Sequence, residues 1–398
     1  MVNLVYIKND YYPNNRASVI QVMNTIYALA LDGVSVHGFF KRKGNERAQD
    51  VLEYYGLAHH DNLDIKLLYV PCFLSKNIAG DIYFTLSAII FLFWRVGKKK
   101  ADIVYCTGVS RYLSFISPIK KMINLKIVSE MHQACLEQKT FKLIKKMYDN
   151  KVFDGIVAIS HVLKKEFVKR GIKSSYIEVA HSGVNPSIKQ SDARLDLINE
   201  LGLPFSENEK IIIYAGHLYP SKGVDTLIKA FSRLKKIIPG ARLIVLGGED
   251  ARDLTRCKDL AAALGMDSYI YFSGPVEPTK VKKYLYVSDI GVLPTPNNDK
   301  DFWEYSSPLK LSEYMESGLA VVASNLECVS EKIKDGWNGI LFTPSDVTDL
   351  SDKMCYILNN NDVRDKIRLN GMESAKAFYF KKRAETIRNF LNDIVAER

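Results

Sequence analysis

A histidine and a lysine stand five residues apart in the segment YAGHLYPSKG, residues 214–223. The apolar run IIIYAG overlaps its start and the helical pattern VDTLIKAFSRLKKI follows it, which places His217 and Lys222 on a strand-to-helix turn. A helix N-terminus offers N–H groups and a positive dipole end, and Lys222 adds a full charge there. Because Gly216 and Gly223 permit tight turns, the segment suits a diphosphate group. The alternative is an ordinary strand–turn–helix with a surface lysine.

A second anion-binding pattern lies in residues 301–324, DFWEYSSPLKLSEYMESGLAVVAS. Ser307 precedes Pro308, which restrains the turn, and a helix is predicted over residues 309–317 with its first N–H groups open to an anion. We expect Glu313, one turn further in, to have small or polar neighbours rather than a lysine partner. Its carboxylate could then accept two hydrogen bonds from the hydroxyls of a ribose. The alternative is a solvated helix glutamate.

Two loops in the first half of the chain also carry candidate groups. Glu130 and His132 end the predicted strand LKIVSEMH two residues apart, so both point to one face. His132 could orient a sugar hydroxyl or stabilise developing charge, whereas a lone histidine is more often structural. Asn14, Asn15 and Arg16 fill the loop after the first strand, where Arg16 could meet a phosphate or an acidic acceptor, or simply lie in solvent.

Strands and helices alternate in both halves of the chain, and the pattern starts afresh at residue 211. Such alternation implies parallel sheets with helices on both faces. Residues 185–204 between the two runs are polar with prolines near both ends and are interpreted as a linker. We therefore predict an α/β protein with two doubly wound Rossmann-like domains, residues 1–187 and 188–377, that face a central cleft. Ligands of such sheets bind at the carboxyl ends of the strands, where all four loops stand.

The net charge of +10 is confined to one half of the 398-residue chain. Residues 1–185 hold 26 Lys and Arg against 15 Asp and Glu, while the remainder holds 29 against 30. A basic half favours an anionic partner: a membrane surface, an anionic lipid-linked substrate or nucleic acid. The 13 apolar residues 82–94, followed by RVGKKK, are too few for a spanning helix, which needs about 20. They indicate a core helix or a helix whose aromatic end touches the bilayer interface.

Several function classes find no support in the sequence. The six cysteines form no CxxC pair and none lies near a histidine at metal-ligand spacing, which indicates buried thiols in a reducing compartment. The first residues lack the pattern of a signal peptide, so we interpret the chain as cytosolic. Neither a Walker A loop nor GxGxxG occurs, and no RRM, KH or zinc motif points to nucleic acid.

With these loops in order, the chain resembles a GT-B glycosyltransferase of family 4, the retaining glycosyltransferases of group 1, over nearly its whole length. SSPLKLSEYMESGLAVVAS resembles the donor-binding helix of that family, and YAGHLYPSKGVDTLIKAF resembles its G-R/H-L-x-x-x-K-G segment. Supporting stretches are AISHVLKKEF, EVAHSGVN, VLGGED and YFSGPVEPTKVKKYLYVSDIGVLPT. YFKKRAETIRNFL resembles the tail that crosses back to the first domain, which gives residues 378–398 that role.

The resemblance implies transfer of a hexose from a UDP- or GDP-linked sugar with retention, without a metal and with no further cofactor. His132, Lys222 and Glu313 would be catalytic: His132 would touch the transferred sugar, Lys222 the diphosphate and Glu313 the ribose. The loop at residues 274–277 would face the base. Further donor contacts would come from Asn15, Arg16, Gly216, His217, Gly248, Val276 and Ser307, and from backbone N–H groups of Pro308, Leu309, Lys310 and Leu311.

Three departures from the family pattern stand in this chain. His217 occupies a position where the family often has Arg, which makes one phosphate contact weaker or dependent on pH. The family motif Glu-x7-Glu has Tyr305 eight residues before Glu313, and Glu304 is one residue off. Asn14 and Asn15 replace the paired glycines of the first loop.

The leading hypothesis is a glycosyltransferase that works at the cytosolic membrane face. Its acceptor would be a lipid-linked sugar or glycolipid in surface polysaccharide or glycan assembly, and its partners would include an anionic membrane surface but no nucleic acid. One alternative is a transferase with a small soluble acceptor. Another is a nucleotide-sugar-binding protein that has lost catalysis.

Overall fold

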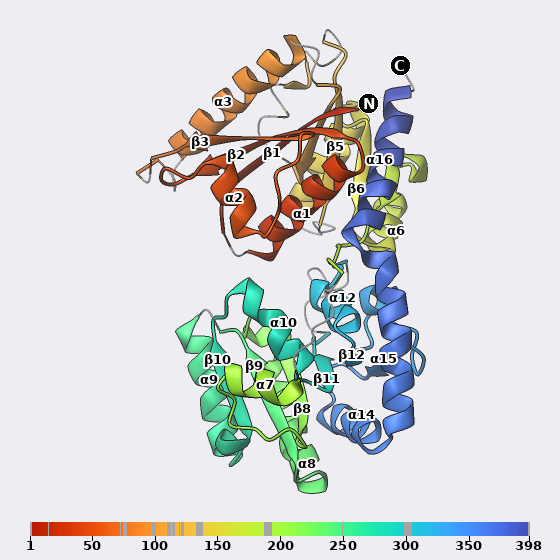
Figure 1. Cartoon of the computed structure of the whole chain (residues 1–398). Coiled ribbons are helices and arrows are strands. Elements are labelled where there is room, and N and C mark those ends of the chain that lie inside the picture. Colours follow the sequence, from red (N-terminus) through yellow and green to blue (C-terminus); the bar gives the residue numbers. More distant parts are fainter. Residues whose placement is uncertain are drawn as a thin grey trace. The chain divides into compact units, whose positions relative to one another are not determined.

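Two α/β units make up the chain: residues 1–183 with 380–398, and residues 184–379 (Figure 1). The boundaries predicted after residue 187 and before residue 378 lie within four residues of these. The N–H of Val184 donates to the carbonyl oxygen of Phe378 at 2.9 Å, a bond within the second unit. This computed structural model describes residues 2–14, 16–71, 73–74, 78–97, 101–109, 113, 116–118, 120, 123–132, 138–186, 193–248, 250–297 and 305–396.

The first unit is built on a seven-stranded parallel sheet in the order β3-β2-β1-β4-β5-β6-β7. Its strands are β1 (Asn3–Tyr11), β2 (Ser35–Arg42), β3 (Leu63–Tyr69), β4 (Ile103–Thr107), β5 (Lys126–Met131), β6 (Gly155–Ala158) and β7 (Ile177–Val179). Its helices are α1 (Ala17–Leu31), α2 (Ala48–Tyr54), α3 (Ile78–Gly97), α5 (Gln138–Asp149), α6 (His161–Lys169), the one-turn η1 (Ser174–Tyr176) and α16 (Phe380–Ala396), which returns from the end of the chain.

Neighbouring residues of β2 pack against helices on opposite faces of this sheet. Phe40 lies in a core with residues of β1, α1 and α16, including Tyr6 and Ile387. Phe39 stacks on Phe91 of α3 instead, with ring centres 4.8 Å apart. Since successive strand residues point to opposite faces, α3 covers one face of the sheet and α1 the other (Figure 1).

The second unit is built on a six-stranded parallel sheet in the order β10-β9-β8-β11-β12-β13. Its strands are β8 (Lys210–Ala215), β9 (Ala241–Leu246), β10 (Ile270–Gly274), β11 (Ile290–Leu293), β12 (Ala320–Ser324) and β13 (Ile340–Phe342). Its helices are α7 (Arg194–Glu200), η2 (Pro220–Lys222), α8 (Val224–Ile237), α9 (Ala251–Ala263), η3 (Asp267–Tyr269), α10 (Pro278–Tyr286), α12 (Leu309–Glu316), α13 (Glu327–Ser330), α14 (Val347–Asn359), α15 (Asn361–Ala375) and η4 (Lys376–Phe378).

Both sheets have the strand order of a doubly wound fold. In each, the chain builds outward from the first strand on one side and then on the other, with switch points between β1 and β4 and between β8 and β11. The prediction of an α/β protein with two Rossmann-like domains is confirmed. Ligand-binding loops of this fold leave the carboxyl ends of strands beside the switch point.

One local interpretation of the sequence was wrong, and one predicted helix is longer than its apolar run. The stretch taken as a linker contains α7, because Leu197 and Ile198 are buried in a core of the second unit. The apolar segment at residues 82–94 belongs to the 20-residue helix α3. The helix begins at Ile78, and Asp81 in its first turn accepts a hydrogen bond from Asn9 of β1 at 3.0 Å.

Candidate active site

Four loops meet at the carboxyl edge of the second sheet. The N–H of Gly247 donates to the carbonyl oxygen of Gly274 at 3.1 Å, which joins the exits of β9 and β10. A Cβ atom on Gly247 would overlap the carbonyl oxygen of Gly216, so the exits of β9 and β8 are in close contact. A Cβ atom on Gly223 would overlap the carbonyl oxygen of Pro294, which follows β11. The backbones of the four loops therefore form one continuous rim.

Lys222 lies on this rim, at the end of η2 and directly before α8. Gly223 is the N-cap of α8 and takes a left-handed conformation with φ of 76°. Burial lowers the pKa of Lys222 to about 8, so its amine still carries a proton in most molecules at neutral pH. The lysine therefore places a positive charge at the positive end of a 14-residue helix.

His217 is held in the same loop by two aromatic residues. The hydroxyl of Tyr214 donates to the carbonyl oxygen of His217 at 2.5 Å. The His217 ring stacks on Tyr219 with ring centres 5.0 Å apart. The structure thus gives His217 a defined position one residue after Gly216, while its contact with a phosphate stays a prediction.

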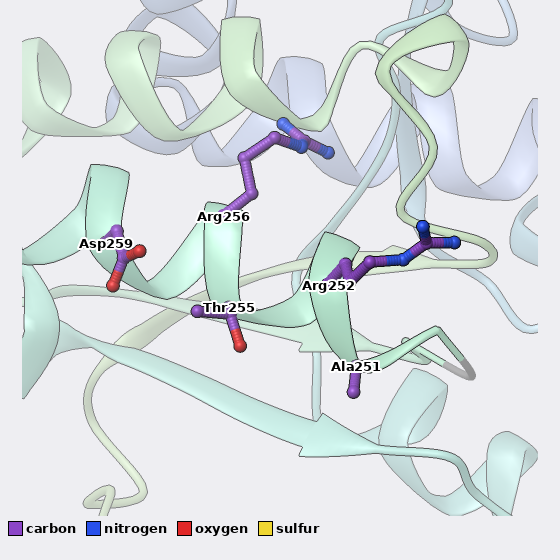
Figure 2. Close-up of a pocket in the computed structure, with 5 residues that line it drawn as sticks. All are labelled: Ala251, Arg252, Thr255, Arg256 and Asp259. Atoms are coloured by element: carbon purple, nitrogen blue, oxygen red, sulfur yellow. The ribbon is translucent and has the colours of Figure 1, made fainter.

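An open hollow of about 520 Å³ runs along α9, and none of its lining residues belongs to the rim (Figure 2). Arg256, which lines it, donates to the carbonyl oxygen of Leu218 and forms an ion pair with Asp225 of α8. Arg256 therefore connects α9 to both ends of the segment that carries Lys222. The hollow is lined by Ala251, Arg252, Thr255, Arg256 and Asp259.

Gly248 and Val276 stand on the two outer loops of the rim. A Cβ atom on Gly248 would lie 3.0 Å from the side chain of Leu218, so Gly248 allows the β9 exit to approach the loop with Lys222. Val276 is half-buried against a core of the second unit and follows β10. The two residues follow β9 and β10, which lie on the same side of β8 in the sheet.

Helix α12 begins at Leu309, and Pro308 is its N-cap. The N–H groups of Leu309, Lys310 and Leu311 belong to the first turn and have no acceptor within the helix. Pro308 has no N–H group, so the contact expected from its backbone nitrogen was wrong. Ser307 before it is buried. Three N–H groups of this turn, rather than four, can point at an anion.

Glu313 has a lysine partner, which corrects the expectation from the sequence. Its Oε2 lies 2.8 Å from Nζ of Lys310, three residues earlier on the same helix face. Both side chains are about one-third exposed, at 33% and 34%. Such a surface pair contributes little to stability, so Glu313 can exchange this partner for the hydroxyls of a ligand.

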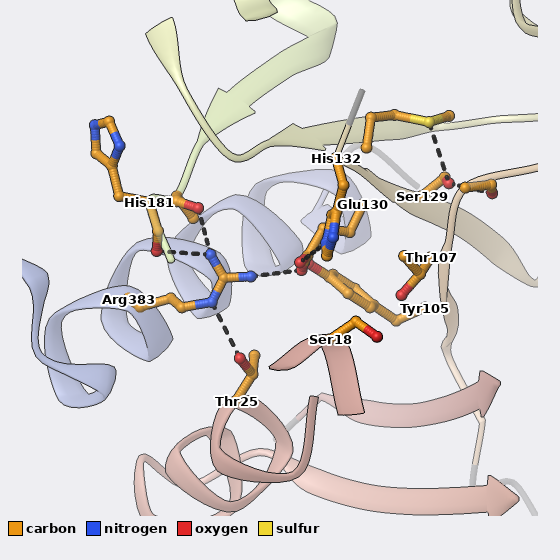
Figure 3. A network of polar contacts seen from close by, with 12 residues as sticks. Ser18, Thr25, Tyr105, Thr107, Ser129, Glu130, His132, His181 and Arg383 are labelled. Atoms are coloured by element: carbon orange, nitrogen blue, oxygen red, sulfur yellow. Dashed lines mark hydrogen bonds and ion pairs between the residues drawn. The ribbon is translucent and has the colours of Figure 1, made fainter. Parts of the chain in front are cut away.

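In the first unit, His132 follows β5 and its Nε2 lies 2.6 Å from Oε1 of Glu130 (Figure 3). The other carboxylate oxygen, Oε2, accepts hydrogen bonds from the hydroxyl of Tyr105 and from Nη2 of Arg383, each at 2.6 Å. Burial by itself would raise the pKa of Glu130, but Arg383 and His132 outweigh it and hold the pKa at about 2. A charged carboxylate therefore fixes the orientation of the His132 ring.

Arg383 belongs to α16 and was not among the residues predicted from the sequence. Glu130 and Arg383 are each 2% exposed at the side chain. The guanidinium also donates to Thr25 Oγ1 at 3.1 Å, to the carbonyl oxygen of His181 at 2.8 Å and to that of Ala180. A signal was present: Glu130 lies in a strand with the apolar residues Ile127 and Val128, and a carboxylate buried there requires a cation elsewhere in the chain.

The first loop of this unit is only partly described. The N–H of Asn14 donates to the hydroxyl of Tyr55 at 2.9 Å, and that hydroxyl donates back to the carbonyl oxygen of Asn14 at 2.7 Å. Arg16 is the N-cap of α1, and its side chain is 74% exposed, 3.8 Å from Asp10. Its side chain is accessible to a ligand at this helix start.

Some predicted residues cannot be placed. Asn15, Glu304 and Lys98 to Lys100 lie outside the described residues. Tyr305, at the position of the missing first glutamate, is buried at 7% exposure. Within the part of the chain that the structure describes, no three His, Cys, Asp or Glu side chains gather into a possible metal site.

The comparisons with known proteins agree with this architecture. Residues 201–374 match the model of the family described as Glycosyl transferases group 1. The solved structure of Anabaena Alr3699/HepE in complex with UDP and glucose has a TM-score of 0.75, with 15% identity over 99% of this chain and 100% of that chain. The chain thus has the GT-B fold in both units, and residues 201–374 belong to group 1 of the glycosyltransferases.

Two relatives give a closer view of the sequence similarity. A D-inositol 3-phosphate glycosyltransferase of Nocardioides sp. is 26% identical over 239 residues, which are 56% of this chain and 50% of that protein. A lipopolysaccharide 1,2-N-acetylglucosaminetransferase of Salmonella typhimurium is 24% identical over 268 residues, which are 65% of this chain and 63% of that protein. The chain spans about half the length of the first of these relatives.

The contact between Gly223 and Pro294 makes a testable prediction. Gly223→Ala is expected to lower the free energy of unfolding by about 3 kcal/mol, because the methyl group is strained at positive φ and overlaps a backbone carbonyl. Gly265→Ala is the matched control, since Gly265 has φ of 67° but open space around it, and should cost only about 1 kcal/mol. Denaturant unfolding measures both. Equal losses would mean that the loop does not depend on its contact with Pro294.

Proposed function

We propose that the chain is a retaining hexosyltransferase of family 4 that uses a UDP- or GDP-linked sugar as donor. The observation that carries the proposal is the rim of the second sheet. Lys222 and the first turn of α12 stand there on loops that follow the neighbouring strands β8 and β11. The solved relative that holds UDP and glucose supports a nucleotide-sugar donor for this fold.

The rim supplies what the departure of a nucleoside diphosphate requires. In the transfer, an acceptor hydroxyl oxygen bonds to the anomeric carbon while the bond from that carbon to the diphosphate oxygen breaks, and the hydroxyl proton passes to the departing diphosphate. Negative charge builds up on the diphosphate, and fixed positive groups stabilise it most when they need no rearrangement. Lys222 and the N–H groups of Leu309, Lys310 and Leu311 are such groups. Retention and independence from a metal follow from the resemblance to family 4.

Glu313 is proposed to bind the ribose hydroxyls of the donor. Glu313→Gln is expected to raise the donor KM by about 10-fold with kcat little changed, because a hydrogen bond to a charged group contributes roughly 1.5–3 kcal/mol. Steady-state kinetics at varied donor concentration measure this. Lys310→Met is the control: it removes the competing ion pair and should leave KM unchanged or lower it. Wild-type kinetics in Glu313→Gln would reject the ribose role.

The proposed acceptor is a lipid-linked sugar or glycolipid in surface polysaccharide or glycan assembly, met at the cytosolic membrane face by a peripherally bound enzyme. The Salmonella relative named for lipopolysaccharide and the excess charge of residues 1–185 support this. His132 would contact the transferred sugar, held in place by Glu130. The relative named for D-inositol 3-phosphate favours the second candidate, a transferase with a small soluble acceptor.

Product analysis tests the reaction. The purified protein is incubated with a nucleotide sugar and either a lipid-linked or a soluble acceptor, with and without EDTA. We expect a product whose anomeric configuration, read from its proton NMR coupling, matches that of the donor, at a rate that EDTA does not change. An inverted product would overturn the retaining assignment. Binding of a nucleotide sugar without any transfer would favour the alternative hypothesis, a nucleotide-sugar-binding protein that has lost catalysis.

A further inference from the structure

Both charged side chains of helix α3 contact residues of the sheet. Its two charged residues are Asp81 and Arg95. Arg95 is 6% exposed and forms an ion pair with Asp64 of β3. Asp81 accepts a hydrogen bond from Asn9 and lies 3.9 Å from Nζ of the buried Lys41. Arg95 thus departs from an ordinary surface helix, whose charges face the solvent, whereas the Asp81 side chain contacts the sheet but is 41% exposed.

The outer side of α3 is apolar along its whole length. Its exposed large side chains recur at helical spacing and are between 41% and 69% exposed. A helix of 20 residues is about 30 Å long, so this surface is extended rather than a single exposed residue. We name it the α3 apolar face; it consists of Ile78, Ile82, Tyr83, Leu86, Ile90, Phe93 and Trp94.

In this fold α3 packs against the sheet of the first unit. By length and composition it could cross a membrane. Its inner side, however, packs on the sheet: Phe84 and Phe91 contact Phe39, with ring centres 5.5 and 4.8 Å apart. The helix therefore presents one long side to its surroundings. Exposed apolar patches of this extent mark interaction sites.

The net charge of residues 1–185 indicates which kind of partner covers the α3 apolar face. Residues 1–185 carry 26 Lys and Arg against 15 Asp and Glu, so an anionic surface is attracted. Near the first turn of α3, Lys41 is buried beside Asp81, but the exposed Lys43 lies over the same Tyr11 ring as Lys41, 5.5 Å from its centre, and can meet an anionic surface. A second copy of this chain on the same face would instead bring two basic halves together, which is unfavourable.

We propose that the α3 apolar face docks the first unit onto an anionic bilayer surface. The helix lies in the plane of the interface with this face in the boundary between headgroups and acyl chains, while Lys43 and other exposed basic side chains of residues 1–185 meet lipid phosphates. The inference deepens the proposed function. It rests on that function only to explain why the enzyme is at a membrane. Binding to vesicles does not itself depend on catalysis.

Vesicle sedimentation with a matched pair of variants tests the docking. The wild type is expected to bind vesicles of phosphatidylglycerol and phosphatidylcholine, to bind phosphatidylcholine alone weakly, and to be released by high salt. Leu86→Gln should weaken the binding about tenfold, from the loss of one buried leucine. Leu31→Gln is the control, because Leu31 is 57% exposed and Leu86 56%, yet Leu31 ends α1 on the other face of the sheet. Equal losses in both variants, or no binding by the wild type, would overturn the proposal.

Trp94 gives a direct measure of depth. Lipids with brominated acyl chains are expected to quench the tryptophan fluorescence of the wild type, and Trp94→Phe should lose most of that quenching. Quenching that persists in Trp94→Phe would place another surface in the bilayer and reject α3. Analytical sedimentation without lipid tests whether a second copy of the chain covers the face instead. A wild-type dimer that Leu86→Gln turns into monomers would make the α3 apolar face an interface between copies and overturn the proposal.

Binding of UDP and of GDP, measured by thermal shift in the same samples, separates the two proposals. Vesicle binding without nucleotide binding would reject the proposed function and leave the docking surface standing. Nucleotide binding and transfer to a soluble acceptor without vesicle binding would reject the docking surface alone.

Discussion

Lys222→Ala is expected to lower kcat/KM for the nucleotide sugar by about 30- to 1,000-fold, which corresponds to roughly 2–4 kcal/mol of lost transition-state stabilisation. The loss is large because Lys222 is partly buried at the start of α8, where a charge interacts more strongly with a phosphate than it does in bulk water. Steady-state kinetics measure the change. Lys229→Ala is the control, because Lys229 is an exposed lysine on the same helix. Unchanged kcat/KM in Lys222→Ala would reject the assignment.

The lowered pKa of Lys222 gives the same prediction a pH dependence. Its pKa of about 8 means that the amine is mainly charged at pH 7 and mainly neutral at pH 9, while the phosphate stays ionised throughout. Affinity for UDP should therefore fall about tenfold over this range. Calorimetric titration in Lys222→Arg should show little slope, because the guanidinium keeps its charge. The same slope in this variant would mean that another group titrates.

Arg383→Ala is expected to lower the free energy of unfolding by about 3–5 kcal/mol, because it leaves the buried carboxylate of Glu130 without its cation. Denaturant unfolding followed by tryptophan fluorescence reports on the first unit when Trp303 and Trp337 are replaced by Phe, which leaves Trp94 as the fluorophore. Arg388→Ala on the same helix is the control: its pair with Asp32 has an arginine side chain that is 34% exposed, and losing it should cost below about 1 kcal/mol. Similar losses in the two variants would contradict the account of the buried pair.

The pair of Glu130 and Arg383 should also make the free energy of unfolding depend on pH in the acid range. The pKa of Glu130 is held at about 2 in the fold and lies near 4.3 in an unfolded chain. Its contribution to stability is therefore complete above the unfolded pKa and is lost as the pH falls toward 2. In Arg383→Ala this part of the acid dependence should shrink. An unchanged acid profile would assign that dependence to other carboxylates.

The sequence placed the main loops because local patterns determine them. An apolar run, a glycine and a helical period were enough to put Lys222 between β8 and α8, and the same logic put Glu313 on α12. The ion pair of Glu313 with Lys310 was also readable, since three-residue spacing on a helix brings side chains together, and it was overlooked.

Contacts between distant segments could not be read in this way. Glu130 and Arg383 are 253 residues apart in the chain, and nothing local to either residue names the other. The contact of Gly223 with the carbonyl of Pro294 likewise depends on how α8 and β11 pack. Such pairs follow from the tertiary arrangement, which patterns within a single segment do not specify.

A thermal-shift screen of UDP, GDP and a panel of nucleotide sugars, run on the wild type and on Lys222→Ala, tests the central claim that the rim of the second sheet binds a nucleoside diphosphate. We predict that at least one of these ligands raises the melting temperature of the wild type and that Lys222→Ala loses most of that shift. If no ligand of the panel stabilises the wild type, or if the variant responds as the wild type does, the claim is contradicted.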